Sequence, residues 1–172
     1  MRIFLVGYMA SGKTTIGRLL AKKLSFEFID LDHYIELKED MSVFNIFQLK
    51  GEVYFRQKES KYLKEVITKN RAVITVGGGT PCYGQNLELL INSPNTQSFY
   101  LKASLNILTE RLYHDKNKRP LIAHVKDRDK LKEFIGKHLF ERYKYYEQAK
   151  VSLNIDHKSV DQIVEEIIFS LF

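Results

Sequence analysis

The sequence predicts an α/β fold of three layers, in which a five-stranded parallel sheet has helices on both of its faces. Short apolar segments alternate along the chain with segments of helical spacing, which is the pattern of repeated strand–helix–strand units. A glycine-rich stretch, Gly7–Thr14, also stands between the first expected strand and the first expected helix. The length of 172 residues suits a single domain, residues 1–172, that folds without disulfides or structural metals.

The first three elements set the direction of the sheet. Arg2–Val6 is a short apolar strand, residues 15–24 have helical spacing, and residues 26–30 form a second strand. Because a crossover helix joins them, the two strands are expected to be parallel, with a right-handed connection. The strands expected over the whole chain are residues 2–6, 26–30, 72–76, 97–101 and 151–155. The later helices expected are residues 84–91, 104–113, 129–149 and 160–169.

Two segments depart from this alternation. Residues 31–70 show almost no strand pattern, and Ser42 is the expected N-cap of a short helix that ends near Gly51. We interpret residues 31–70 as a helical substrate-binding insertion. Residues 114–128 contain five Lys or Arg residues, one Pro and no strong period, and we interpret them as a mobile lid.

The amino-acid composition limits the kinds of partner that the chain is expected to bind. Its 27 Lys and Arg residues against 21 Asp and Glu residues leave a net charge of +6, which suits anionic ligands but is too dispersed to indicate nucleic-acid binding. Cys82 is the only cysteine, so an internal disulfide is impossible. No apolar run approaches the ~18 residues of a membrane span, and the first strand leaves no room for a signal peptide. We expect a cytoplasmic monomer that binds small molecules, without nucleic-acid or membrane partners.

The stretch Gly7–Thr14 has the spelling G-x-x-x-x-G-K-T in the strand-to-helix context of a phosphate-binding loop. Backbone N–H groups at the start of a helix hold a polyphosphate, and glycines allow the loop's close approaches. Lys13 supplies a cation for the β- and γ-phosphates, and the Thr14 hydroxyl is placed to ligate Mg²⁺. The alternative is an ordinary glycine-rich turn.

Asp30 and Asp32 follow the second expected strand, at the edge where doubly wound sheets bind ligands. If the chain stays extended for two more residues, both side chains project to the same side. Two carboxylates this close need a counter-charge, and Mg²⁺ held with nucleotide phosphates provides one. Alternatively, one of them only caps the following helix.

Two further motifs suit a substrate acid. Arg56 and Glu59 are three apart on a helix, so the carboxylate can orient the guanidinium for bidentate capture of a substrate carboxylate. Gly77–Gly79 follow a buried strand and let backbone approach a ligand, with Gly78 expected against the substrate. A surface ion pair and a tight turn without a ligand are the respective alternatives.

Two more arginines are candidates. Arg119 lies in the basic segment, where a closing loop could bring it onto a transferring phosphoryl group, although a solvated charge run is the usual meaning of such a segment. Arg142 extends an apolar helical stripe, so it needs an anion from an internal carboxylate or from a substrate. His138, on the same stripe, is expected to be a hydrogen-bonded interior histidine.

In this order and spacing, the motifs resemble those of the shikimate kinase family, over nearly the whole chain. The matching segments are Gly7–Thr14, Asp30–Asp32, Gly51–Glu59, Val76–Gly79, Lys118–Ile122 and Glu141–Ala149. The resemblance implies a P-loop fold like that of nucleoside monophosphate kinases. It also implies transfer of the γ-phosphoryl group of ATP to the 3-hydroxyl of shikimate, on the route to chorismate and aromatic amino acids.

The resemblance also implies roles for individual residues. Asp32 would bind the reacting hydroxyl and take its proton, Arg119 would close onto ATP, and the Gly78 backbone would contact the ring. Arg56, held by Glu59, and Arg142 would clamp the shikimate carboxylate. Mg²⁺ would bind Thr14, with Asp30 reaching it through water. The residues that would hold the ATP phosphates are Ala10, Ser11, Gly12, Lys13, Thr14 and Thr15.

Two other functions remain open from the sequence. One is a kinase of another small acceptor, such as gluconate or a nucleoside monophosphate, on the same fold. Two arginines and an aspartate around one acceptor favour a hydroxy acid over a nucleotide. The other is a non-catalytic P-loop binding module, which would not need Lys13, Thr14, Asp30, Asp32 and Arg119 together.

Overall fold

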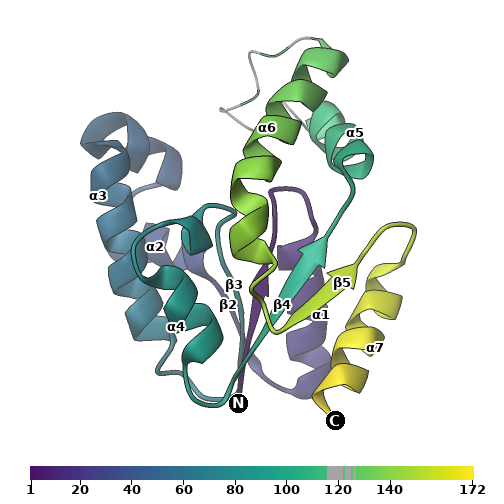
Figure 1. Cartoon of the computed structure of the whole chain (residues 1–172). Coiled ribbons are helices and arrows are strands. Elements are labelled where there is room, and N and C mark those ends of the chain that lie inside the picture. The colour runs from purple at the N-terminus through teal and green to yellow at the C-terminus, as the bar shows by residue number, and fades with distance from the viewer. Residues whose placement is uncertain (116–121, 123–124, 126) are drawn as a thin grey trace.

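The sheet has five strands, all parallel, in the computed structural model, which describes residues 1–115, 122, 125 and 127–172. The strand order is β2-β3-β1-β4-β5, so β1 is the central strand (Figure 1). The predicted architecture is confirmed. The strands are β1 (Arg2–Val6), β2 (Glu27–Asp30), β3 (Ala72–Thr75), β4 (Thr96–Lys102) and β5 (Val151–Asn154).

Helices cover both faces of this sheet. One face is covered by α1, with α7 packed beside it, and the other by α4 and the C-terminal half of α6 (Figure 1). A Cβ at Gly17 would lie 2.8 Å from the Phe28 ring and 2.9 Å from Thr75, so glycine lets α1 lie close to the sheet. The helices are α1 (Lys13–Leu24), α2 (Leu31–Glu39), α3 (Val43–Val66), α4 (Asn86–Asn92), α5 (Leu105–Asp115), α6 (Arg128–Tyr146) and α7 (Val160–Leu171), with a 3₁₀ turn at Thr80–Cys82.

The strand register brings three loops to one edge of the sheet. Thr75, the last residue of β3, is opposite Leu5 on β1 and Asp30 on β2. The chain segments that begin at Gly7, Leu31 and Val76 therefore leave the sheet side by side. The strands beneath them are fixed by a buried core, in which Ile3, Phe4 and Leu5 have no exposed surface. This edge is where parallel sheets place their ligands.

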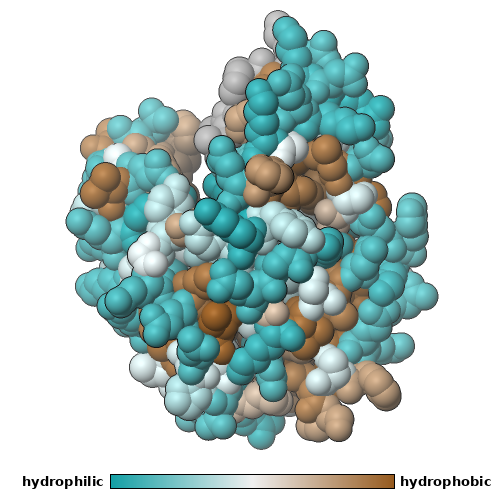
Figure 2. All heavy atoms as spheres, viewed as in Figure 1, coloured by the Kyte–Doolittle hydropathy of each residue, from teal (hydrophilic) through white to brown (hydrophobic). Residues whose placement is uncertain are grey.

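The helical insertion predicted for residues 31–70 is formed by α2 and α3. Ser42 caps α3 as expected, accepting a hydrogen bond from the Asn45 N–H at 3.2 Å. Gly51 interrupts the helix with φ 81° and ψ 169°, so the predicted short helix ends there and a second helical segment continues at an angle. A notch separates α3 from the upper part of α6 on the face shown in Figure 2.

A carboxylate at the end of α2 ties the two helices of the insertion together. Glu39 accepts hydrogen bonds from Tyr54 and Tyr62, each at 2.5 Å, and pairs with Lys58 at 2.8 Å. Although burial opposes the charge, the hydrogen bonds from Lys58 and the two tyrosines lower the pKa of Glu39 to about 2. Glu39 thus ties the end of α2 to the part of α3 that follows Gly51.

The remaining element ends differ little from the prediction. Helix α6 ends at Tyr146, earlier than expected, because Glu147 begins a turn before β5. The expected lid, residues 114–128, overlaps α5 and α6 at its ends, and most of its middle lies outside the described residues. Among the helices that the structure describes, none is long and apolar enough to span a membrane.

Candidate active site

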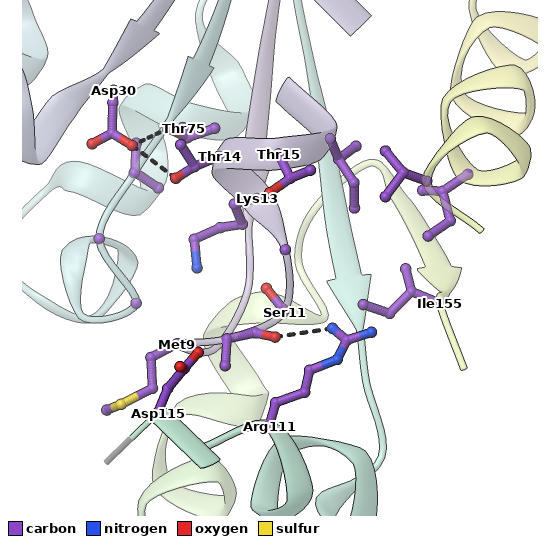
Figure 3. A pocket seen from close by; sticks show the side chains of 18 of the residues that line it. Met9, Ser11, Lys13, Thr14, Thr15, Asp30, Thr75, Arg111, Asp115 and Ile155 are labelled. Atoms are coloured by element: carbon purple, nitrogen blue, oxygen red, sulfur yellow. Dashed lines mark hydrogen bonds between the residues drawn. The ribbon is translucent and has the colours of Figure 1, made fainter. Parts of the chain in front are cut away.

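The loop after β1 wraps around a space at the N-terminus of α1. Gly7 and Gly12 have φ values of 147° and 88°, and a Cβ at Gly7 would lie 2.9 Å from the Leu101 carbonyl oxygen. Ala10 also has a positive φ of 62°, which strains a residue with a side chain. Lys13 folds back over the loop and donates to the carbonyls of Gly7 and Tyr8 at 2.8 and 2.9 Å. The geometry agrees with the predicted phosphate-binding loop (Figure 3).

A cavity of about 710 Å³ opens over this loop. Its wall also includes Asp30 and Asp32 from the β2–α2 junction and Gly77 and Gly78 from the end of β3. On the far side, α5 contributes Arg111, which donates to the Ala10 carbonyl at 2.9 Å (Figure 3). The described residues around the cavity thus bring the candidate phosphate-binding loop and acidic side chains to a single space.

Asp30 and Asp32 correct one expectation from the sequence. The chain does not stay extended after Asp30, because α2 begins at Leu31. Asp30 is the N-cap of that helix and accepts from the His33 N–H at 3.4 Å, as the simpler alternative proposed. Its carboxylate also accepts from the hydroxyls of Thr14 at 2.9 Å and Thr75 at 3.1 Å (Figure 3). Asp30 therefore caps α2 and faces the phosphate loop at the same time.

Asp32 lies in the first turn of α2, and it is one of the residues that line the cavity. Burial, together with the negative charges of Asp30 and Glu59, raises the pKa of its half-buried carboxyl to about 7, although the positive charges of Lys13 and Arg56 oppose this rise. A carboxylate with a pKa near neutrality accepts a proton readily at physiological pH. Asp32 is therefore suited to proton transfer.

The Gly77–Gly79 turn brings three polar groups together. A Cβ at Gly77 would lie 3.1 Å from Oδ1 of Asp32, and one at Gly78 would lie 3.3 Å from Nη1 of Arg142. A Cβ at Gly79 would lie only 2.8 Å from Nη2 of Arg56. Any side chain here would displace these groups, so the turn needs glycine for space. One short segment thus collects an aspartate and two arginines from α2, α3 and α6.

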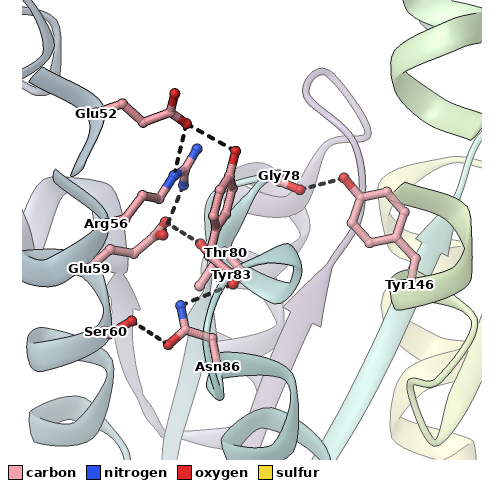
Figure 4. A network of polar contacts seen from close by, with 9 residues as sticks. All are labelled: Glu52, Arg56, Glu59, Ser60, Gly78, Thr80, Tyr83, Asn86 and Tyr146. Carbon is pink, nitrogen blue, oxygen red and sulfur yellow. Dashed lines mark hydrogen bonds and ion pairs between the residues drawn. The ribbon is translucent and has the colours of Figure 1, made fainter. Parts of the chain in front are cut away.

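The guanidinium of Arg56 is fixed from several sides. Its Nη1 pairs with Glu59 at 2.9 Å, and Glu59 is fully buried and accepts from the Thr80 hydroxyl at 2.6 Å (Figure 4). Its Nε lies 3.4 Å from a Glu52 oxygen, and its central carbon lies 4.0 Å from the centre of the Tyr83 ring. The predicted Arg56–Glu59 pair is therefore confirmed as an interior contact and not a solvated one.

Arg142 lies on the inward stripe of α6, as the sequence predicted. No carboxylate of the described residues lies within ion-pair distance of its guanidinium, which stands 5.9 Å from the centre of the Tyr8 ring. Tyr146, one turn further on, donates to the Gly78 carbonyl at 2.5 Å (Figure 4). His138 is hydrogen-bonded to the Tyr8 hydroxyl at 3.0 Å, and burial lowers its pKa, so it is the interior histidine that was expected.

Several contacts were not foreseen from the sequence. Arg111 and Tyr83 were not singled out, because each is an unremarkable residue of a helix or loop until the chain folds. Thr80 was missed for the same reason, although it follows the glycines directly. Arg119, which was predicted to close onto ATP, lies outside the described residues, so its role stays a prediction.

Comparisons with known proteins agree with this geometry. Residues 9–171 match the family model described as shikimate kinase. A shikimate kinase of Flavobacterium psychrophilum is 47% identical over 172 residues, which is 99% of each chain. The crystal structure of shikimate kinase from Bacteroides thetaiotaomicron has a TM-score of 0.90 at 36% identity, covering 99% of this chain and 98% of that one. The Acinetobacter baumannii enzyme, in complex with shikimate, has a TM-score of 0.83 at 32% identity, covering 99% and 92%.

Proposed function

Because the chain belongs to the shikimate kinase family, we propose how its own residues divide the work of phosphoryl transfer from ATP to shikimate. The chain is an ATP-dependent small-molecule kinase, a shikimate kinase of aromatic amino acid biosynthesis. Phosphoryl transfer passes through a loose transition state, so positioning and charge neutralisation do most of the catalysis. The role of each residue therefore follows from the charge that it carries and from its position in the site.

The ATP phosphates are proposed to lie in the loop at the N-terminus of α1. The loop's backbone N–H groups and the start of the helix favour anions. Lys13 now donates to two carbonyls of the loop and would exchange these for phosphate oxygens. The residues proposed to contact the phosphates are Ala10, Ser11, Gly12, Lys13, Thr14 and Thr15, with Arg119 as a further ATP contact.

The Thr14 hydroxyl and the Asp30 carboxylate are proposed to hold Mg²⁺. They are oxygen donors 2.9 Å apart beside the phosphate loop, which fits a hard cation. Within the described residues there is no cluster of three or more His, Cys, Asp or Glu side chains that could hold a metal. This fits Mg²⁺, which takes few protein ligands and keeps phosphate and water oxygens. When bound, the ion neutralises negative charge on the phosphates.

The shikimate site is proposed to lie along the Gly77–Gly79 turn. Arg56 and Arg142 would hold the carboxylate, since Arg56 is oriented by Glu59 and no described carboxylate neutralises Arg142. Gly78 would lie against the ring of the acid. Asp32 would bind the 3-hydroxyl and accept its proton as the phosphoryl group arrives.

The observation that supports this proposal most strongly is the convergence at the glycine turn. Asp32 and the two arginines come from three different helices, and each approaches a different glycine of the turn. Two arginines beside a carboxylate suit a hydroxy acid, whose acid and hydroxyl ends bind opposite charges. They do not suit the base and ribose of a nucleoside monophosphate.

A coupled assay of ADP release tests the acceptor. We expect turnover with shikimate and none above background with gluconate, AMP or CMP. Arg56→Ala should raise the KM for shikimate far more than the KM for ATP, because truncating one side of a charge clamp costs about 2–5 kcal/mol. An equal rise in both KM values would show that Arg56 does not bind the carboxylate.

We also infer a monomer in the cytoplasm. Exposed large apolar side chains among the described residues are spread over several elements, for example Leu37, Phe140 and Phe169. Such scattered residues are normal on monomer surfaces. An enzyme of amino acid biosynthesis that consumes ATP is expected where ATP is supplied. Light scattering after size-exclusion chromatography, with and without ATP, tests the oligomeric state.

A further inference from the structure

The Arg56 guanidinium has two carboxylate neighbours and one close ring, while the rings of Phe55 and Phe47 lie further away, with centres 5.2 and 6.0 Å from its central carbon. Glu59 binds Nη1 at 2.9 Å with a side chain that is 1% exposed, whereas the Glu52 contact to Nε is 3.4 Å long and its side chain is 55% exposed. The close ring is that of Tyr83, whose centre lies 4.0 Å from the central carbon of the guanidinium. Nη2 has no hydrogen-bond partner among the described residues and faces the glycine turn at Gly79.

Tyr83 is itself anchored in place. Its hydroxyl donates to Glu52 at 3.0 Å, to the same carboxylate oxygen that Nε of Arg56 approaches (Figure 4). Glu52 therefore contacts both the Tyr83 hydroxyl and the Arg56 guanidinium. The residue follows the 3₁₀ turn whose Thr80 donates to Glu59, and Asn86 donates to the Thr80 carbonyl at 3.1 Å. The segment of residues 80–86 therefore positions both Glu59, which is the main carboxylate partner of Arg56, and the Tyr83 ring beside the guanidinium.

The Tyr83 ring restrains the plane of the guanidinium in a way that neither carboxylate can. A single hydrogen bond from Nη1 to Glu59 constrains the tilt of the guanidinium plane only weakly, and the exposed Glu52 contact, at 3.4 Å, adds little to it. A flat aromatic face over the cation fixes the plane and attracts the charge. With Nη1 and the plane fixed, the Nη2 edge is left presented along the glycine turn.

We propose that Tyr83 is a positioning residue for the substrate carboxylate, acting by holding the plane of Arg56. The proposal rests on the proposed role of Arg56 and deepens it. It distinguishes the face of the ring from its hydroxyl. The ring fixes the cation, and the hydroxyl fixes the ring.

Two substitutions of Tyr83 test the role of its ring. Tyr83→Leu should raise the KM for shikimate about tenfold and leave the KM for ATP within about twofold, as expected for loss of a partly buried cation–π contact. Tyr83→Phe keeps the ring and should stay within about threefold of the parent for both substrates. Since Tyr83 is 37% exposed, neither change opens the core.

Phe26→Leu is a matched control. Phe26 lies 5.3 Å from the guanidinium carbon of Arg71, so it forms a second Arg–ring pair, at the opposite edge of the sheet. Its replacement should leave both KM values unchanged. Thermal unfolding of all variants shows whether stability changes separately from KM.

A double-mutant cycle with Arg56→Ala decides the mechanism. If Tyr83 acts only through Arg56, then Tyr83→Leu should lower kcat/KM for shikimate by less than about twofold in the Arg56→Ala background. The same full loss in both backgrounds would overturn the proposal, as would an unchanged KM for shikimate in Tyr83→Leu alone. If Arg56→Ala itself leaves that KM unchanged, the proposed carboxylate site fails instead, so the two failures are distinguishable.

Discussion

Replacing Asp32 by Asn should make the protein more stable while abolishing its turnover. Burial, with help from Asp30 and Glu59, raises the pKa of Asp32 from an ordinary 3.8 to about 7, so the folded protein disfavours the ionised carboxylate. At about 1.4 kcal/mol for each tenfold change in proton affinity, ionising this group costs the folded state up to about 4 kcal/mol. Asn carries no charge and escapes this cost, but it cannot accept the proton of the substrate hydroxyl.

The pH dependence follows from the direction of the pKa change. The folded state binds the Asp32 proton more tightly than the unfolded state, so ionisation destabilises the parent as pH rises from about 4 to 7. The advantage of Asp32→Asn should be largest, about 2–4 kcal/mol, at pH 8. It should fall by about 1.4 kcal/mol per pH unit below pH 7 and vanish near pH 3.8.

Urea unfolding of the parent and Asp32→Asn at pH 8 and pH 5, beside an ADP-release assay, measures both effects. Asp30→Asn is the control, because the Asp30 carboxylate accepts three hydrogen bonds and its replacement should destabilise the fold. Equal stability of the parent and Asp32→Asn at pH 8 would refute the electrostatic reasoning. Near-normal turnover of the variant would remove Asp32 from proton transfer.

Three further predictions concern the phosphate loop and its supports. Arg111→Ala should raise the KM for ATP about tenfold and spare that for shikimate, since Arg111 lines the cavity and bonds Ala10; steady-state kinetics with equal effects on both substrates would contradict this. Tyr8→Phe should lower the free energy of unfolding by about 1 kcal/mol through loss of its bond to His138, and an unchanged urea midpoint would argue against that bond. Ala10→Gly should raise stability by up to about 1 kcal/mol, because it relieves the positive φ, and a lower melting temperature would disagree.

The sequence was enough for the phosphate loop and the order of elements. The loop motif is local, because the spacing of Gly7, Gly12 and Lys13 between an expected strand and an expected helix can be read from one short segment. The apolar strands and helical periods likewise predicted a parallel sheet, because each pattern reports the burial of its own segment. The inward position of Arg142 followed from the same periodicity on α6.

The prediction was wrong for the backbone after Asp30, where the sequence allowed either a strand or a helix. The chain after Asp30 could have continued as a strand, but capping α2 satisfies backbone N–H groups at once, and the helix begins at Leu31. That helical turn brings Asp32 beside Gly77, so the local geometry predicted for Asp32 was wrong, while its role in the reaction stays a prediction.

The sequence by itself determined which segments are strands and helices, where the phosphate-loop motif lies, and which charged residues face inward, because those properties depend on neighbours along the chain. Tertiary structure alone decided that Asp32, Arg56 and Arg142 approach consecutive glycines, that Arg111 reaches the phosphate loop, and that Tyr83 lies over Arg56. These contacts join residues far apart in sequence. They exist only because parallel strands in register bring the ends of β1, β2 and β3 to one edge, where helices from distant parts of the chain meet.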